Sequence, residues 1–443
     1  MSTTRSMALL RKLATGLSIL APLTMMPYDV VAQASSQRAD PLTLERAVAI
    51  ALDNSPDLGA LSAQSAALGV VAPQVGALPD PMLSLNAMNL PTDTFDFDQE
   101  PMTQLQLGVS QRFPYPGKRR LRRQAATSEF KASQAQFAEG RDALISKVRS
   151  AWWRLFALDR AVEIVDRNQD LMRDFIVIAQ TKYTVGGGLQ QDVLLAQLEL
   201  TKLLDRESRL QGKRRSAQAH LNGLLDRRPD HAVSLNRVPA SSELPQLPAQ
   251  AELLIAAQES RALLDVQREK LNAARTRRKL AERDRYPDFR VGAGYGYRQG
   301  EDPLRGGDRA DLFSVLFSVT VPIYAGNKQS KAIEQRASEQ AAHAYALSSV
   351  ARSIETEIGQ KVADYEAARE QVRLLDGAII PQAEQTVASM LAGYQVNQVD
   401  FLNVVNGQLT LYNARINYWG ALGEAKSALA GLAAAVGKET LYE

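Results

Sequence analysis

The sequence predicts a mainly α-helical, internally duplicated chain that also carries four strands of a membrane β-barrel. Three observations predict this fold class. Residues 118–185 contain no proline and no glycine pair, and four other stretches of about ten residues alternate apolar with polar side chains. Similar motifs also recur along the chain at an offset of 205 to 211 residues, which is typical of a repeated unit.

The first 34 residues predict a secretory signal. Arg5, Arg11 and Lys12 precede an apolar run over residues 13–26, and the small residues of 31–34 provide a cleavage site. A transmembrane anchor is the alternative, but the run is too short for a hydrocarbon core of about 30 Å. We therefore expect an exported protein whose mature part begins near residue 35.

Composition excludes several classes of protein. The sequence has no cysteine, which excludes a disulfide framework, a cysteine metal site and a lipidated cysteine at the mature N-terminus. The formal charge of +3 falls to +1 without the predicted signal, and such a balance argues against nucleic-acid binding. Hydrophobic residues make up 45% and aromatic residues only 6%, as in long packed helices.

The repeated motifs divide the chain into two copies of one unit. We place the first repeat at 35–228, a proline-rich connector at 229–248 and the second repeat at 249–443. Each copy is expected to contain a helix, two strands and a long helical hairpin. The matched pairs are Pro79-Asp80 with Pro287-Asp288, Phe113-Pro114 with Val321-Pro322, and Tyr183 with Tyr394.

The strands are expected at about 82–90, 102–113, 289–298 and 311–323. Alternation predicts one polar and one apolar face. The polar candidates, expected to line a lumen, are Gln104, Gln106, Ser110 and Arg290. The apolar candidates, expected to face lipid, are Leu105, Leu107, Val109, Phe313 and Phe317. A soluble sheet with one face on a core is the alternative. Since lipid cannot accept open strand edges and four strands cannot enclose a pore, several chains would have to close the barrel.

The helical segments predict long packed rods. A continuous helix over 118–185 would measure about 100 Å at 1.5 Å per residue. Further along, apolar positions step by three and four residues, as in a coiled-coil seam. These positions are Leu402, Val405, Leu409, Tyr412, Ile416 and Trp419.

Each long hairpin has one break. The first contains Gly186, Gly187 and Gly188 and is followed by Asp192, which is suited to cap the next helix. The second lies at 396–403 and has Asn403 as its expected cap. The two breaks are either docking points for a partner or plain turns, and spacing alone does not separate these alternatives.

These residues together resemble the TolC family of outer-membrane efflux channels over nearly the whole mature chain. The opening Leu42-Thr43-Leu44-Glu45 is similar to the family's first helix, and the tip pattern Val-Gly-x5-Asp-Val-Leu-x-Ala is present from Val185 to Ala196. The stretches LPDPML, MNLP, FDFDQEPMTQ and QRFPYPGKR resemble the branch that accompanies heavy-metal resistance pumps.

The resemblance implies a homotrimer whose twelve strands close one barrel in the outer membrane of a Gram-negative bacterium, above a helical periplasmic tunnel. It also implies two partners, a periplasmic membrane-fusion adaptor and an inner-membrane pump of the resistance-nodulation-division type (RND). The tips would form the tunnel entrance and meet the adaptor, through Val185, Gly186, Gly187, Gly188, Asp192, Val396, Asp400, Asn403 and Asn406. This chain has Asn403 and Asn406 where the family often has a gating acidic ring, so either Asp400 or Asp192 supplies the charge or gating differs.

Motifs for enzyme chemistry are absent from the sequence. The three histidines, His220, His231 and His343, lack the spacing of a metal site, so no metal site or cofactor is expected. Met82 and Met88 are interpreted as lipid-facing or packing residues.

Two further patterns have structural interpretations. The alternating glycines 292, 294 and 296 lie within a strand, which argues against a dinucleotide fingerprint and indicates a crowded lumen. The basic cluster at 118–123 is interpreted as a collar at the membrane interface.

The resemblance thus implies a passive outer-membrane exit duct for heavy-metal cations, opened by an adaptor at its helical tips. Export of drugs or organic compounds, or type I protein secretion, is one alternative. A periplasmic coiled-coil scaffold without a pore is another.

Overall fold

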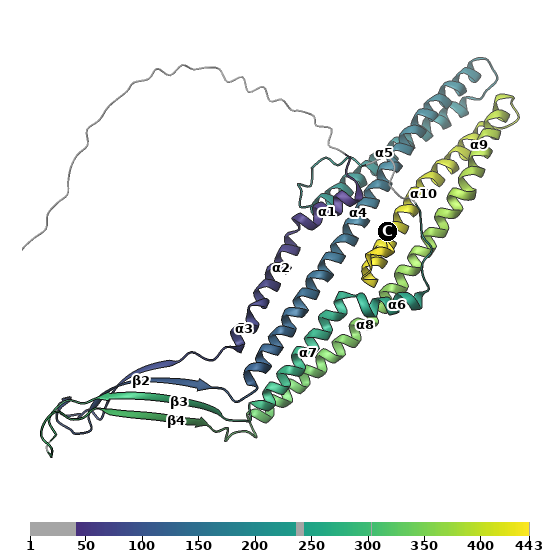
Figure 1. Cartoon of the computed structure of the whole chain (residues 1–443). Helices are drawn as coiled ribbons and strands as arrows, with labels where there is room; N and C mark the ends of the chain where they lie inside the picture. Colours follow the sequence, from purple (N-terminus) through teal and green to yellow (C-terminus); the bar gives the residue numbers. More distant parts are fainter. Residues whose placement is uncertain (1–40, 236–242, 303, 443) are drawn as a thin grey trace, which may run out of the picture. The chain divides into compact units, whose positions relative to one another are not determined.

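The computed structural model of the chain describes residues 41–235, 243–302 and 304–442, so the predicted signal lies outside the described residues. These ranges form helices along most of their length and one sheet (Figure 1). The helices are α1 (Leu44–Asn54), α2 (Pro56–Gly69), α3 (Val71–Gly76), α4 (Lys118–Thr184), α5 (Gln190–Leu224), α6 (Gln250–Ser260), α7 (Ala262–Arg283), α8 (Gln329–Leu374), α9 (Ile380–Gln395) and α10 (Phe401–Val436). The strands are β1 (Met82–Met88), β2 (Gln104–Phe113), β3 (Asp288–Tyr297) and β4 (Leu312–Thr320).

The sheet joins the two halves of the chain. Its order is β1-β2-β3-β4 with antiparallel pairing throughout, and the central β2–β3 pair brings together strands that are far apart in sequence (Figure 1). Within the described residues, β1 and β4 each have one edge without a partner strand. Unpaired backbone groups on such edges can pair with another chain.

Helix α4 confirms the prediction of an uninterrupted rod, because it spans 67 residues and ends one residue before the expected position. It begins after Gly117, whose φ of 95° lets the chain turn from strand into helix. Its internal Gly140 lies where α2 approaches closely, since a Cβ there would be 2.7 Å from Leu61 Cδ1. A glycine inside a helix is therefore explained here by packing.

The core runs along α4, which packs against α1, α2, α3, α5, α7 and α10. It contains an aromatic group in which Trp152 stacks on Phe156 at 5.3 Å and Trp419 meets the edge of Phe156 at 5.6 Å. The buried Trp152 indole donates to the Leu42 carbonyl at 3.0 Å, which ties the start of α1 to α4. Burial of one such ring stabilises the fold by about 2–3 kcal/mol.

The seam predicted along α10 is confirmed except at its first position. Val405 and Tyr412 are buried, and Leu409, Ile416 and Trp419 pack against the same core. Leu402 is instead 52% exposed, because Phe401 and Val404 point into the core at the start of α10. The prediction for Leu402 was wrong by one residue.

Helices α2 and α3 form a small-residue layer on α4. Residues 56–76 are long and apolar enough to cross a membrane by length and composition alone. In the structure they pack along α4, where Gly69 lies against the Phe130 ring and Gly76 against the Arg123 side chain.

Candidate functional site

The first hairpin tip is a five-residue turn that joins α4 to α5. The Gly187 N–H donates to the Lys182 carbonyl at 2.9 Å, and Gly186 adopts a left-handed φ of 72°. A left-handed residue just after the last turn is a common way to end a helix. Glycine is favoured at that position because residues with a Cβ are strained at a positive φ. A Cβ on Gly188 would lie 2.9 Å from Lys182 Cβ. Position 188 therefore also requires glycine, because the turn passes so close to the Lys182 side chain.

The second tip repeats the turn with different residues. The Gln398 N–H donates to the Gly393 carbonyl at 2.8 Å, and Asn397, at an offset of 211 from Gly186, has a φ of 62°. Asparagine is among the few residues that tolerate this conformation. The backbone thus makes an equivalent turn at both tips although only the first has glycines.

The expected helix caps were wrong. Helices α5 and α10 begin earlier than predicted, so Leu189 and Asp400 hold the cap positions, and neither makes a side-chain capping bond. Asp192 instead lies within the first turn of α5, where its charge is favourable at the positive end of the helix dipole. Asn403 lies within the first turn of α10.

Lys182 of the first hairpin connects the two tips by hydrogen bonds, a tie that was not predicted from the sequence. Lys182 Nζ donates to the Tyr394 carbonyl at 2.6 Å and to Asn397 Oδ1 at 2.7 Å, and it lies 4.0 Å from the centre of the Tyr394 ring. Tyr394 in turn packs on Phe401 at 5.3 Å. Burial, followed by the nearby Asp192 carboxylate, raises the pKa of the Tyr394 hydroxyl.

The predicted tip residues surround this tie and are mostly exposed. Val185 and Val396 are 77% and 63% exposed at the two turns, whereas Gly188 and Asp192 are half-buried. The remaining exposed members are Gly186, Gly187, Asp400, Asn403 and Asn406. Apolar and amide groups presented at the ends of helical hairpins are suited to contact another protein.

The sheet has one apolar and one polar face, as its alternation predicts. Leu85, Leu107, Tyr295 and Phe313 follow one another across the four strands, and their side chains are at least 52% exposed. In this register Leu105, Val109 and Phe317 share their face. The opposite face contains Gln104, Gln106, Ser110 and Arg290. A chain alone in water would not expose this much contiguous apolar surface.

The glycines of β3 leave room for the polar side chains of β2. A Cβ on Gly294 would be 2.7 Å from Gln106 Nε2, which crosses the strand to donate to Ser314 Oγ at 2.8 Å. A Cβ on Gly296 would collide with Gln104 in the same way. The polar face is thus crowded at these glycines, whereas its role as a lumen stays a prediction.

Met82 and Met88 were interpreted as lipid-facing or packing residues, and the register contradicts the first of these two interpretations. Met82 pairs with Ser110 and Met88 with Gln104, so both thioethers belong to the polar face. Met88 Sδ lies 3.9 Å from Gln104 Nε2, a contact with an amide rather than with apolar groups.

The interpretation of residues 118–123 as a basic collar at the membrane interface was also partly wrong. Lys118 is buried and its Nζ lies 2.9 Å from Asp288 Oδ1 and 3.4 Å from Asp284 Oδ1. Arg119 Nε donates to the Gly76 carbonyl at 2.9 Å. These two cations hold strand, turn and helix together, whereas Arg120 and Arg123 are exposed.

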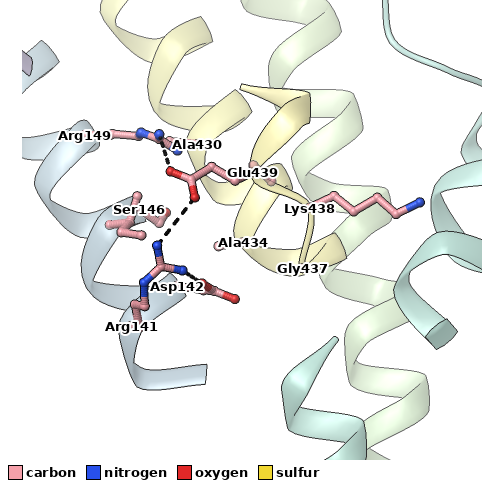
Figure 2. A pocket seen from close by; sticks show the side chains of 11 residues that line it. Arg141, Asp142, Ser146, Arg149, Ala430, Ala434, Gly437, Lys438 and Glu439 are labelled. Carbon is pink, nitrogen blue, oxygen red and sulfur yellow. Dashed lines mark hydrogen bonds and ion pairs between the residues drawn. The ribbon is translucent and has the colours of Figure 1, made fainter. Parts of the chain in front are cut away.

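A small cavity of about 160 Å³ lies between α4 and the segment that follows α10 (Figure 2). Figure 2 shows Glu439 aimed at two arginines of α4, with Arg149 at 3.0 Å and Arg141 at 3.8 Å. Arg141 also lies 3.5 Å from Asp142, whose pKa is raised first by burial. Glu439 is paired with both arginines, so these ion pairs anchor the segment that follows α10 to α4.

The described ranges contain no group of three or more histidine, aspartate or glutamate side chains placed to hold a metal ion.

This combination of an apolar-faced open sheet with two long helical hairpins is the architecture of a channel subunit. The family model described as outer membrane efflux protein matches residues 47–227 and 253–438, and the chain belongs to this family. Its helix-rich, internally duplicated fold is the family's fold, so the predicted fold class is confirmed.

Relatives agree with this assignment. The cobalt-zinc-cadmium resistance protein CzcC of Cupriavidus metallidurans is 22% identical over 394 residues, which cover 88% of each chain. CusC, which forms a transmembrane channel, has a TM-score of 0.74 at 15% identity, and the match covers 95% of this chain and 99% of CusC. VceC of Vibrio cholerae has a TM-score of 0.73 at 20% identity over 90% of this chain and 97% of its own.

Proposed function

We propose that the protein is the passive outer-membrane exit duct of a tripartite efflux system and that its cargo is heavy-metal cations. The observation that carries the proposal is the pair of unlike faces and the two unpaired edges of the sheet. One face is apolar and exposed, the other is polar, and both edge strands lack partners within the described chain. In a membrane those edges must be paired, and three copies would close a barrel of twelve strands.

The polar face would then line the lumen, through Gln104, Gln106, Ser110 and Arg290. The apolar face, with Leu105, Leu107, Val109, Phe313 and Phe317, would meet lipid. The long hairpins would continue the pore as a periplasmic tunnel. Energy comes from an inner-membrane pump of the resistance-nodulation-division type, because a duct of this kind only provides a path.

The tips are the proposed entrance and the proposed contact with a periplasmic adaptor. Exposed Val185 and Val396 would provide apolar contacts. Asn403 and Asn406 lie one turn apart on the exposed face of α10 and would form an uncharged aperture. Metal as the cargo is supported by the resemblance to CzcC, which is named as a cobalt-zinc-cadmium resistance protein.

The first experiment is single-channel conductance of the detergent-purified protein in a planar bilayer, together with its mass. We expect a stable trimer with discrete conductance steps. A soluble monomer or dimer without conductance would favour a periplasmic scaffold. A strain that lacks the gene tests the cargo. If its metal tolerance is unchanged while it becomes sensitive to drugs or fails to secrete a protein, the cargo is drugs or a protein and not metal cations.

A pair of neighbouring substitutions tests the two faces. Leu107→Arg places a charge on the proposed lipid face, which costs about 2–4 kcal/mol near the middle of a membrane barrel. Gln106→Arg adds the same group to the proposed lumen face and is the matched control. We expect heat-resistant trimers in the outer membrane to be lost only for Leu107→Arg, and equal assembly of both variants would contradict the assignment of faces.

A further inference from the structure

The two hairpins of the sheet are copies of each other in their strand register. Met82 pairs with Ser110 in the β1–β2 hairpin, and Arg290 pairs with Ser318 in the β3–β4 hairpin, so both members of the pair move by 208 residues. The remaining pairs of the β1–β2 hairpin obey the same shift. Because the shift is even, equivalent residues lie on the same face of the sheet. The β2–β3 pairing, which joins the two hairpins, therefore shows how a further hairpin would be added.

The two open edges of the sheet fit each other when the β2–β3 pairing is moved by 208 residues. This shift places β4 of one copy antiparallel to β1 of the next, with Ser318 opposite Ser84 and Phe317 opposite Leu85. The first pair joins the polar faces and the second joins the apolar faces. When one edge pairs with the other edge of the next copy, the assembly closes into a ring if the rotation allows it.

An ion pair fastens the β2–β3 seam at the end next to the long helices. Lys118 Nζ lies 2.9 Å from Asp288 Oδ1, and the two side chains are 5% and 9% exposed. Beside this pair the rings of Tyr115 and Tyr286 stack with their centres 4.6 Å apart. Since the lysine opens α4 and the aspartate opens β3, these contacts join the start of a long helix to the neighbouring strand.

The equivalent residues at the open edges lack such partners within the described parts of the chain. The shift of 208 leads from the buried aspartate to Asp80, and the buried lysine corresponds to Lys328 at an offset of 210, because the turn after β4 is longer. Both side chains are exposed, and neither belongs to an ion pair between described residues. Leu78 and Ile323 hold the positions of the two stacked tyrosines and are 39% and 74% exposed. One edge thus offers a carboxylate and an apolar group, and the other offers a lysine and an apolar group.

Asp80 has two possible partners in its own chain, and it pairs with neither. The β1–β2 register continued by two residues places Asp80 opposite Arg112, but Arg112 Nη2 instead lies 2.8 Å from Asp288 Oδ2. Arg290 is exposed at the same end of the sheet, but its strand is separated from β1 by β2. The carboxylate is therefore available to a lysine of another copy.

We propose that two copies of the chain meet as β2 and β3 do, with β4 of one copy paired to β1 of the next and Lys328 of the first bound to Asp80 of the second. The inference rests on the proposed function, because it requires copies of the sheet to close into a ring. Thr320 replaces Arg112 at this seam, so the lysine is the only cation that the shift assigns to Asp80. Loss of this one ion pair is therefore expected to weaken the ring.

Disulfide cross-linking tests the register, because the chain has no cysteine of its own. Ser84→Cys combined with Ser318→Cys places two thiols opposite each other across the seam, within reach of a disulfide. Ser84→Cys combined with Thr320→Cys is the matched control, shifted by two residues on the same face. After mild oxidation of the detergent-purified protein, we expect covalent dimers and trimers on denaturing gels only from the first combination. Trimers that cross-link equally in both, only in the control or in neither would overturn the register.

Charge exchange tests the ion pair. Asp80→Lys and Lys328→Asp each place like charges at the seam, so each is expected to lower the temperature at which the trimer dissociates by a few degrees. The two substitutions together are expected to restore it. Asp80→Lys combined with Lys331→Asp is the control and should show no rescue, because Lys331 pairs with Glu334 within α8. Additive losses in the exchanged double variant would overturn the ion pair.

The wild-type protein separates failure of this inference from failure of the proposed duct. A conducting wild-type trimer whose variants show neither the expected cross-link nor the rescue would overturn the inference and leave the duct intact. A wild-type protein that is monomeric and gives no conductance step would overturn the duct and this inference with it.

Discussion

The lysine that ties the two helical tips gives the sharpest prediction. Lys182→Met keeps the length of the side chain but removes two hydrogen bonds, to the Tyr394 carbonyl and to Asn397 Oδ1, and the contact with the Tyr394 ring. At a half-exposed site these interactions together contribute about 2 kcal/mol. Released tips would then be about 30-fold more populated in each chain.

The assay is the open probability of single channels without an adaptor, together with the sensitivity of cells to large antibiotics. We expect longer openings and greater sensitivity for Lys182→Met. Lys202→Met is the matched control, because Lys202 pairs with Glu199 within α5 and does not reach the other hairpin. Equal open probability in the two variants would refute the view that Lys182 holds the tips together.

Three further predictions concern stability. Burial raises the pKa of Tyr442 from 10.0 to about 12, so its contribution to the free energy of unfolding, about 3 kcal/mol, is complete below pH 10 and is lost as the pH rises through 12. Denaturant unfolding of Tyr442→Phe should lack this alkaline loss, and a decline equal to that of the wild type would contradict the assignment. Glu439→Gln should lower the free energy of unfolding by about 1 kcal/mol, because Arg149 and Arg141 lose their carboxylate partner, and it should lower the heat resistance of the trimer. Lys438 is exposed, so Lys438→Gln should change this heat resistance little. Gly186→Ala should cost about 1 kcal/mol at its φ of 72°, and Gly187→Ala should be nearly neutral because a Cβ there meets only ordinary contacts; equal melting temperatures would argue against backbone strain.

Long-range periodicity made the architecture predictable. Residues 118–185 lack the breakers that end helices, so local propensity and tertiary packing agree along α4. The alternation in β2 placed Leu107 and Gln106 on opposite faces before any partner strand was known. The same two-residue period puts Met82 and Met88 on the face of Ser84 and Asn86. Because methionine is apolar, both residues were nevertheless interpreted as lipid-facing or packing.

Contacts between the two halves were not predictable in the same way. Lys118 was one of several basic residues in sequence, and only the β2–β3 pairing brings Asp288 within 2.9 Å of it. The tie at Lys182 has a similar origin. The equivalent position in the second repeat is Gly393, so comparison of the repeats shows that the lysine differs but does not show what it touches.

The two tips also show why one backbone turn is built from different residues. Glycine at position 397 would adopt the left-handed conformation at least as easily as asparagine does, but it could not offer an oxygen to Lys182. Asn397→Gly therefore keeps the turn and removes one of the two acceptors of the lysine, which separates the conformation of the tip from its tie to the other hairpin. We expect an open probability between those of the wild type and Lys182→Met, with unchanged heat resistance of the trimer. An open probability equal to that of the wild type would mean that the Tyr394 carbonyl and ring alone hold Lys182, and that the asparagine serves only the turn.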